Sequence, residues 1–168
     1  SSVAVASRMC AAALGSQTGG STCRPASYNG IVGLKPTYGR LSRHGVIPVS
    51  WSLDTVGILV RTVEDAAMML SAMAGHDPND PSSADQPVLD YQRAVTQAVS
   101  PPRIRLLRQF FFDQSDPETR SHTEGVAHRL GLAGALVDEA PLPSSFDTCL
   151  SAHRVVMAVD CAAFHEEL

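Results

Sequence analysis

The sequence has few lysines, few aromatic residues and no long apolar run. Lys35 is the only lysine among 13 lysine and arginine residues, and the net charge is −4. A negative chain argues against a nucleic-acid-binding surface, and no apolar stretch is long enough to span a bilayer. Residues 1–14 are apolar, but Arg8 interrupts them and no basic segment leads them, so they predict no targeting signal. We therefore expect neither nucleic acid nor a membrane as a partner.

Motifs for binding metals are also missing. The four cysteines, at positions 10, 23, 149 and 161, show no C-x-x-C spacing and no histidine pairing suited to zinc. His165-Glu166-Glu167 ends before an H-E-x-x-H motif can form. We therefore expect no metal site and no cofactor. We interpret the cysteines as small buried thiols in a reducing, cytoplasmic compartment.

The rest of the composition is that of a folded domain. Hydrophobic residues make up 44% of the 168 residues and charged residues 18%. These values are typical of globular chains and not of disordered ones. A chain of this length can bury one sizeable core, and the sequence has no internal repeat and no low-complexity tract.

A run of small residues, GSQTGGSTCR at 15–24, is the most distinctive feature of the sequence. Glycine lets a backbone approach a ligand closely, and Gly19 and Gly20 precede the hydroxyl of Ser21. One interpretation is a phosphate-binding loop, G-x-x-x-x-G-K-[ST], although Ser21 stands in place of its lysine. A second is a tight glycine turn. A third is an acyl-transfer loop, in which Ser21 attacks a carbonyl and backbone N–H groups bind the oxyanion.

Further motifs decide between these interpretations. The sequence contains RPA at 24–26, GLKPTYGR at 33–40, WSLDTVG at 51–57, RTVEDAA at 61–67 and AGHDPNDP at 74–81. Together with GSQTGGS at 15–21, these motifs resemble the amidase signature family in their order and spacing. The resemblance is dense over residues 3–83 and faint beyond. It favours the acyl-transfer interpretation and implies part of an α/β fold, in which a mixed β-sheet is flanked by helices on both faces.

The resemblance also implies the catalytic groups. Ser21 matches the nucleophile that forms the acyl-enzyme. The backbone N–H groups of Thr18, Gly19, Gly20 and Ser21 match the oxyanion hole, where one donor is typically worth about 3 kcal/mol of transition-state stabilisation. In this family a lysine kept neutral by burial acts as the base through a bridging serine. The bridging serine should fall just before Ser1 and the lysine further upstream, so we expect the chain to be an internal piece of a longer protein.

Three further side chains are interpreted as support for the loop. Many relatives have an aspartate at the position of Gln17 and an arginine one residue closer to the nucleophile than Arg24. The loop electrostatics of the family therefore do not transfer directly, and we expect Arg24 to brace the loop rather than to contact substrate. We expect Asp54 to be a scaffold that accepts hydrogen bonds from backbone N–H groups.

Two other ways of activating Ser21 stay open. Lys35 belongs to the GLKPT motif, which is interpreted as structural, yet a close approach to Ser21 would allow it to act as a base. Residue type also allows a Ser21–His44–Asp54 triad. Nothing in the spacing of these residues supports a triad, which is recognised by geometry.

The pattern of apolar residues, glycines and prolines predicts the individual elements. We expect one partial domain over residues 1–168, with a motif core over 1–83 and a strand–helix–strand extension over 100–168. The extension has the lengths of a βαβ unit with a parallel strand pair. The predicted helices cover 2–14, 63–74 after a Thr62 cap, 91–99, 117–130 after Asp116, and 149–168; the predicted strands cover 31–32, 55–60, 104–107 and 135–137.

These observations predict hydrolysis of a small-molecule linear amide to an acid and ammonia or an amine, through an acyl-serine intermediate. Two alternatives stay open. One is the glutamine-hydrolysing A subunit of a tRNA-dependent amidotransferase, which frees ammonia for a partner subunit. The other is a degenerate copy without catalysis. We expect the 168-residue chain alone to be inactive, and a homodimer is kept open as its assembly.

Overall fold

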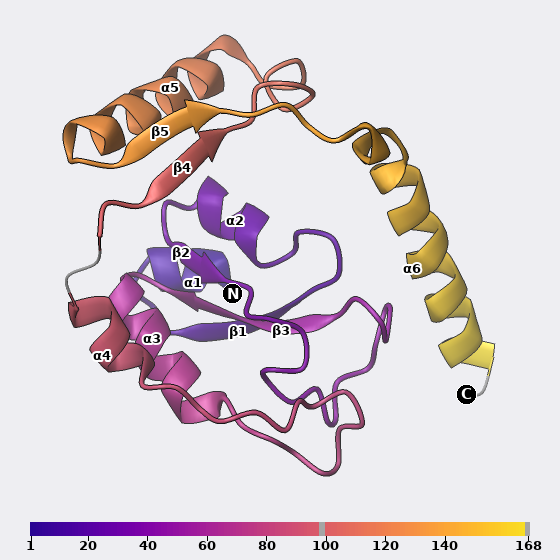
Figure 1. Cartoon of the computed structure of the whole chain (residues 1–168). Coiled ribbons are helices and arrows are strands. Elements are labelled where there is room, and N and C mark those ends of the chain that lie inside the picture. Colours follow the sequence, from indigo (N-terminus) through magenta and orange to yellow (C-terminus); the bar gives the residue numbers. More distant parts are fainter. Residues whose placement is uncertain (98–99, 167–168) are drawn as a thin grey trace. The chain divides into compact units, whose positions relative to one another are not determined.

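The computed structural model describes residues 1–97 and 100–166 (Figure 1). The chain divides into two compact units. The first unit comprises Ser1–Gln97 together with Ser151–Leu168, and the second unit comprises Ala98–Leu150. We describe each unit by itself.

The first unit is built on a three-stranded antiparallel sheet in which β3 (Thr55–Val60) is the central strand. It pairs with β1 (Ala13–Gln17) on one side and with β2 (Val32–Leu34) on the other. All six residues of β3 are buried. The predicted strand over 55–60 is confirmed, because a short apolar run rich in β-branched residues is typical of a strand that is covered on both faces.

Helices cover both faces of this sheet. On one face, α3 (Val63–Met73) packs Ala66 and Leu70 against Ile58. On the other face, Leu59 packs against Val5 of α1 (Ser2–Ala6) and Ala26 of α2 (Cys23–Tyr28). Neighbouring residues of a strand point to opposite faces, so Ile58 and Leu59 serve two different cores. The α/β class predicted from the sequence is confirmed.

The prediction of one helix over residues 2–14 is wrong. The helix ends at Ala6, Arg8 adopts a left-handed conformation with φ of 62°, and β1 begins at Ala13. An alanine-rich segment has a high helix propensity, but propensity is a weak prior when a strand partner is available. Here β3 supplies that partner, in a register that pairs Gly15 with Gly57.

The cap of α3 follows the prediction. The Thr62 side chain accepts a hydrogen bond from Asp65 N at 3.1 Å, which satisfies one of the free N–H groups at the start of the helix. The next helix, α4, covers Tyr91–Thr96. Residues 98–99 of the predicted helix over 91–99 lie outside the described residues.

The second unit is a strand–helix–strand unit, as predicted. It contains β4 (Arg103–Leu106), α5 (Pro117–Leu132) and β5 (Leu136–Glu139), with the two strands parallel. Asp116 caps α5 by accepting a hydrogen bond from Thr119 N at 2.7 Å, and Pro117 follows at the first helical position. A short 3₁₀ helix covers Ser144–Thr148.

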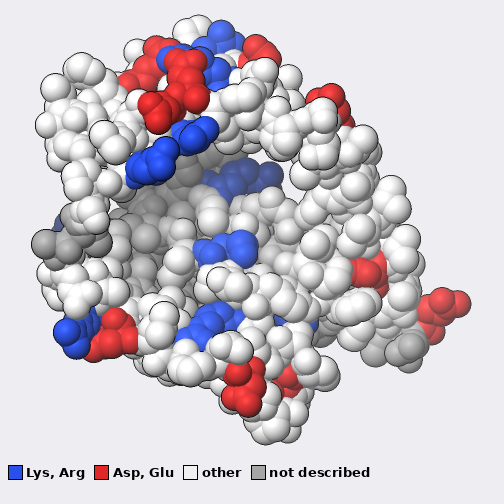
Figure 2. All heavy atoms as spheres, in the orientation of Figure 1, with Lys and Arg blue, Asp and Glu red and all other residues white. Residues whose placement is uncertain are grey.

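The last helix, α6, covers Cys149–Glu166; residues 167–168 of the predicted helix lie outside the described residues. Among residues 1–97 and 100–166, no helix combines the length and the apolar character needed to cross a bilayer. On the face seen in Figure 2, basic side chains stand singly or in small groups, some of them beside acidic side chains.

Candidate functional site

The predicted nucleophile loop connects β1 to α2 in the first unit. Ser21 is exposed at its end, and the next residue, Thr22, is completely buried. The loop therefore presents one hydroxyl outward while the adjacent side chain anchors the backbone in the core. This is the arrangement that an attacking serine needs, because its oxygen must reach a substrate while its backbone stays fixed.

Gln17 holds the two ends of the loop together. Its Oε1 accepts hydrogen bonds from Thr22 N and Cys23 N, both at 2.9 Å. These N–H groups lie at the start of α2, where backbone donors have no partner within the helix. The side-chain amide therefore occupies a position that an anion would take in a phosphate-binding loop.

The N–H groups that lie between these contacts are uncommitted. Within residues 1–97 and 100–166, the backbone N–H groups of Thr18, Gly19, Gly20 and Ser21 donate no hydrogen bond. They are four consecutive donors in a loop whose ends are fixed. Such donors can stabilise negative charge that develops on a substrate oxygen.

Asp54 ties the loop to a neighbouring turn. Its Oδ1 accepts a short hydrogen bond from Thr18 Oγ1, and its Oδ2 accepts from Val49 N at 2.7 Å and Ser50 N at 3.1 Å. Asp54 is only 4% exposed, so these bonds compensate for the burial of its carboxylate. Asp54 thus accepts hydrogen bonds from two backbone N–H groups and one hydroxyl, and its role as a scaffold stays a prediction.

The helix α6 reaches this turn through Asp160. Its Oδ2 accepts hydrogen bonds from Ser50 Oγ at 2.6 Å and Ser52 Oγ at 2.5 Å. The bond from Ser50, followed by that from Ser52, lowers the pKa of Asp160 below its ordinary value. A chain of hydrogen bonds thus runs from α6 through Ser50 and Asp54 to Thr18 of the loop.

His153 is a residue of the site that sequence reasoning missed. A Cβ added at Gly19 would lie 3.2 Å from His153 Nε2, so this imidazole lies against the loop. His153 and Asp160 are seven residues apart in α6 and therefore share one face of the helix. A contact between residues separated by more than 130 positions leaves no local signal in the sequence.

Two glycines outside the loop make room for Thr22. A Cβ at Gly57 would lie 2.7 Å from Thr22 Cγ2 and closer still to Thr22 Oγ1, and a Cβ at Gly33 would lie 3.0 Å from the Thr22 carbonyl oxygen. The loop therefore sits directly on the backbone of β2 and β3. In the described part of the chain, Thr22 Oγ1 is the buried side-chain oxygen that has no hydrogen-bond partner.

The remaining predicted residues are placed as follows. The Arg24 side chain is exposed and forms no hydrogen bond or ion pair with residues 1–97 or 100–166, while its backbone N–H donates to Gly20 O at 2.9 Å. Lys35 Nζ donates to Pro36 O at 2.8 Å. Among the described residues, neither Lys35 nor His44 hydrogen-bonds to Ser21, so neither activating alternative has the required contact.

The cysteines differ from the prediction of buried thiols. Cys23 and Cys149 are exposed, Cys10 and Cys161 are half-buried, and all four are free. Cys23 is exposed because it begins α2 directly after the loop. In the chain segments 1–97 and 100–166, no cluster of three histidine, cysteine or acidic side chains could hold a metal ion.

Comparison with known proteins relates this loop to one family. The family model described as Amidase matches residues 1–167. The A subunit of the glutamyl-tRNA(Gln) amidotransferase of Pelobacter propionicus is 43% identical over 163 residues, which are 97% of this chain and 33% of that protein. The chain therefore spans about a third of the length of such relatives.

Two solved structures have the same fold. A peptide amidase in complex with the competitive inhibitor chymostatin is 38% identical with a TM-score of 0.87, covering 99% of this chain and 34% of the other. The A subunit of the glutamyl-tRNA(Gln) amidotransferase of Thermotoga maritima is 28% identical with a TM-score of 0.89, covering 100% of this chain and 37% of the other.

Proposed function

Because the chain belongs to the amidase family, we propose that it supplies the nucleophile and the oxyanion-binding loop of an amide-hydrolysing enzyme. Ser21 Oγ attacks the amide carbonyl, the C–N bond breaks as the amine leaves with a proton, and water then releases the acid from the acyl-serine. The substrate is a small linear amide. Free thiols at all four cysteines agree with a cytoplasmic protein.

One observation carries this proposal: four uncommitted N–H groups lie beside an exposed serine in a loop that is fixed at both ends. Gln17 fixes the far end of the loop, and Asp54 fixes its beginning through Thr18. Donors held in place before the reaction need no reorganisation when the oxyanion forms. A bare glycine turn requires none of these supports.

The proposal needs a base, because a serine hydroxyl is a weak nucleophile at its ordinary pKa. Lys35 Nζ donates to Pro36 O and, among the described residues, does not hydrogen-bond to Ser21. We assign the base to a lysine that acts through a bridging serine, both from outside these 168 residues. We therefore expect the 168-residue chain to be inert on its own.

A second candidate is the glutamine-hydrolysing subunit of an amidotransferase. The name of the Pelobacter propionicus relative favours it, and it would require a partner subunit that receives ammonia. Release of glutamate from glutamine, increased by that partner, would distinguish it from a stand-alone amidase. A stand-alone amidase would hydrolyse simple amides at the same rate without a partner.

Treatment with a fluorophosphonate tests the proposal. In a longer polypeptide that carries the lysine and the bridging serine, one phosphonate should attach, and peptide mapping should place it on Ser21. Ser21→Ala should abolish labelling, while Ser27→Ala, an exposed serine of α2, should leave it intact. The 168-residue chain should stay unlabelled.

Two results would contradict this scheme. Labelling of the short chain at Ser21 would place the base within these 168 residues. An ordered longer protein that fails to label would favour the degenerate copy, and would remove the hydrolytic function altogether.

A further inference from the structure

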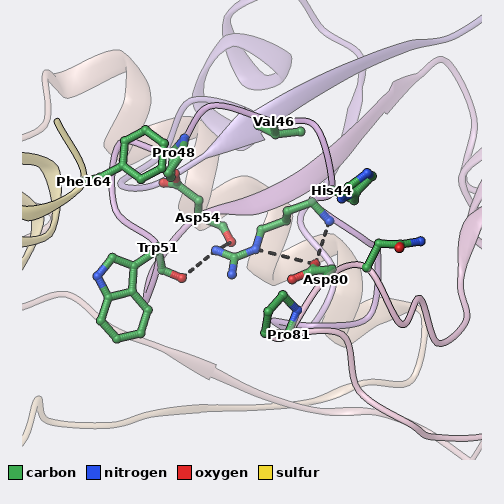
Figure 3. A pocket seen from close by; sticks show the side chains of 10 residues that line it. His44, Val46, Pro48, Trp51, Asp54, Asp80, Pro81 and Phe164 are labelled. Atoms are coloured by element: carbon green, nitrogen blue, oxygen red, sulfur yellow. Dashed lines mark hydrogen bonds and ion pairs between the residues drawn. The ribbon is translucent and has the colours of Figure 1, made fainter. Parts of the chain in front are cut away.

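A cavity of about 200 Å³ lies beside the turn that supports the nucleophile loop. Three parts of the first unit line it: residues 43–54, residues 79–81 and Phe164 of α6. Figure 3 shows Phe164 and Trp51 on one side of the cavity and His44 on the opposite side. The hydrogen bonds of Asp160 to Ser50 and Ser52 fix α6 next to this turn, which places Phe164, four residues after Asp160, in the wall.

The charged groups of the cavity are already paired with the protein. The Arg43 guanidinium donates to Trp51 O at 2.6 Å, to Ser82 Oγ at 2.6 Å and to Tyr38 OH at 2.8 Å. It also forms an ion pair with Asp80 at 3.9 Å. Asp80 in turn accepts from Arg43 N and from Ser82. A guanidinium with its donors occupied does not select a charged ligand.

The remaining wall is mostly apolar, with His44 and Asn79 as its polar members, and it is partly open to solvent. Trp51 is 56% exposed and Val46 41% exposed, and the other apolar lining residues are Pro48, Pro81 and Phe164. Aromatic side chains bury large areas when a ligand covers them. A dry cavity of about 150 Å³ is known to hold benzene, so this volume suits a single ring.

Asp54 connects the cavity to the nucleophile loop. Asp54 lines the cavity and accepts the hydrogen bond from Thr18, three residues before Ser21. We propose that the cavity binds an apolar, ring-sized group of the amide substrate, and so selects ring-bearing amides over short aliphatic ones. This inference rests on the proposed function, since it names the substrate class of the same site.

Trp51 provides a direct test that needs no catalysis. It is the only tryptophan of the chain, so its fluorescence reports on this cavity alone. Cyclohexanecarboxamide carries an apolar ring and does not absorb at the wavelengths of tryptophan excitation and emission. Titration with it should change the Trp51 emission in a saturable way. Acetamide at the same concentrations should leave the emission unchanged. An identical response to both amides, or none to either, would overturn the proposal.

Matched variants locate the binding. Phe164→Ala removes one aromatic wall and should weaken binding of cyclohexanecarboxamide about tenfold, with the fold checked by circular dichroism. Phe111→Ala, a partly exposed phenylalanine of the second unit, should have no effect. Equal weakening by both variants would mean that the ligand is not bound in this cavity.

Activity separates this inference from the proposed function. In a form that is labelled at Ser21, Trp51→Ser should lower kcat/KM for cyclohexanecarboxamide about tenfold and change that for acetamide less than about twofold. An unchanged ratio between the two amides would overturn the substrate role of the cavity while the hydrolytic function stands. If the protein binds the ring but Ser21 is never labelled, the hydrolytic function is overturned, and with it the role of the cavity in binding substrate.

Discussion

The two units of this chain differ in how they bury their strands. In the first unit, all six residues of β3 are buried between helices on both faces. In the second unit, β4 alternates between exposed and half-buried residues, and α5 has no buried residue. The exposed Arg108 side chain bridges Glu124 and Glu139 there, and surface ion pairs contribute little to stability. The predicted nucleophile loop therefore belongs to the unit whose sheet is packed on both faces.

The largest effect should come from emptying the core of the first unit. Ile58 is fully buried, and Ile58→Ala should destabilise the unit by about 3 kcal/mol, because it removes buried apolar area and leaves a cavity. Leu136→Ala, at a strand residue of the second unit that is 57% exposed, should cost well under about 1 kcal/mol. Urea denaturation followed by circular dichroism measures both. Equal costs would mean that the two units do not differ in packing.

A glycine in each unit gives the next comparison. Gly57→Ala should destabilise by about 2 kcal/mol, because its Cβ would overlap Thr22. Gly125→Ala in α5 meets only the end of the Arg129 side chain, at 3.8 Å, and should stabilise by about 1 kcal/mol, as alanine does in a helix interior. Thermal melts report both signs. A tolerated Gly57→Ala would show that the loop does not depend on close contact with β3.

A smaller gain should come from the unpaired hydroxyl beneath the loop. Thr22→Val keeps the shape and removes the buried Oγ1, which has no partner among the described residues, so it should stabilise the first unit by about 1 kcal/mol. Thr62→Val serves as the control, because Thr62 Oγ1 caps α3 and its loss should cost about 1 kcal/mol. If both variants destabilise alike, the Thr22 hydroxyl has a partner in solution.

The smallest effect concerns pH. Hydrogen bonds from Ser50 and Ser52 lower the pKa of Asp160, and bonds from Thr119 lower that of Asp116 in the second unit. A carboxylate whose pKa is lowered by folding stabilises the protein at pH values above its ordinary pKa of 3.8. This stabilisation is lost as the pH falls through the lower pKa of the folded state. Protection factors for amide hydrogen exchange in residues 50–54, which are corrected for the pH dependence of intrinsic exchange, should therefore fall in acid, and Asp160→Asn should remove this acid response. Asp116→Asn should leave it unchanged, and an effect of Asp116→Asn on these residues would contradict the assignment.

Local chemistry decided which parts of the fold could be predicted. The strand over 55–60, the Thr62 cap and the Asp116-Pro117 start of α5 each have a signal within a few residues, and each is confirmed. The helix predicted over 2–14 failed because pairing with β3, more than 40 residues away, overrides alanine propensity.

The site shows the same difference between local signals and long-range contacts. The run of glycines and hydroxyls indicated the loop, because its chemistry is local. The contacts of Asp160 with Ser50 and of His153 with Gly19 join residues more than 100 positions apart. No spacing rule predicts such contacts, and the roles of Ser21 and of the N–H groups before it stay predictions.

Gln17 closes the beginning of α2 with a carboxamide where a carboxylate could also reach the two N–H groups. A carboxylate would gain a proton in acid and change its hydrogen-bonding capacity, whereas the carboxamide oxygen keeps the same lone pairs at every pH. The two hydrogen bonds that Gln17 accepts beside Ser21 are therefore independent of pH. An acid limb in the rate of Ser21 labelling would therefore report a group other than the side chain of Gln17.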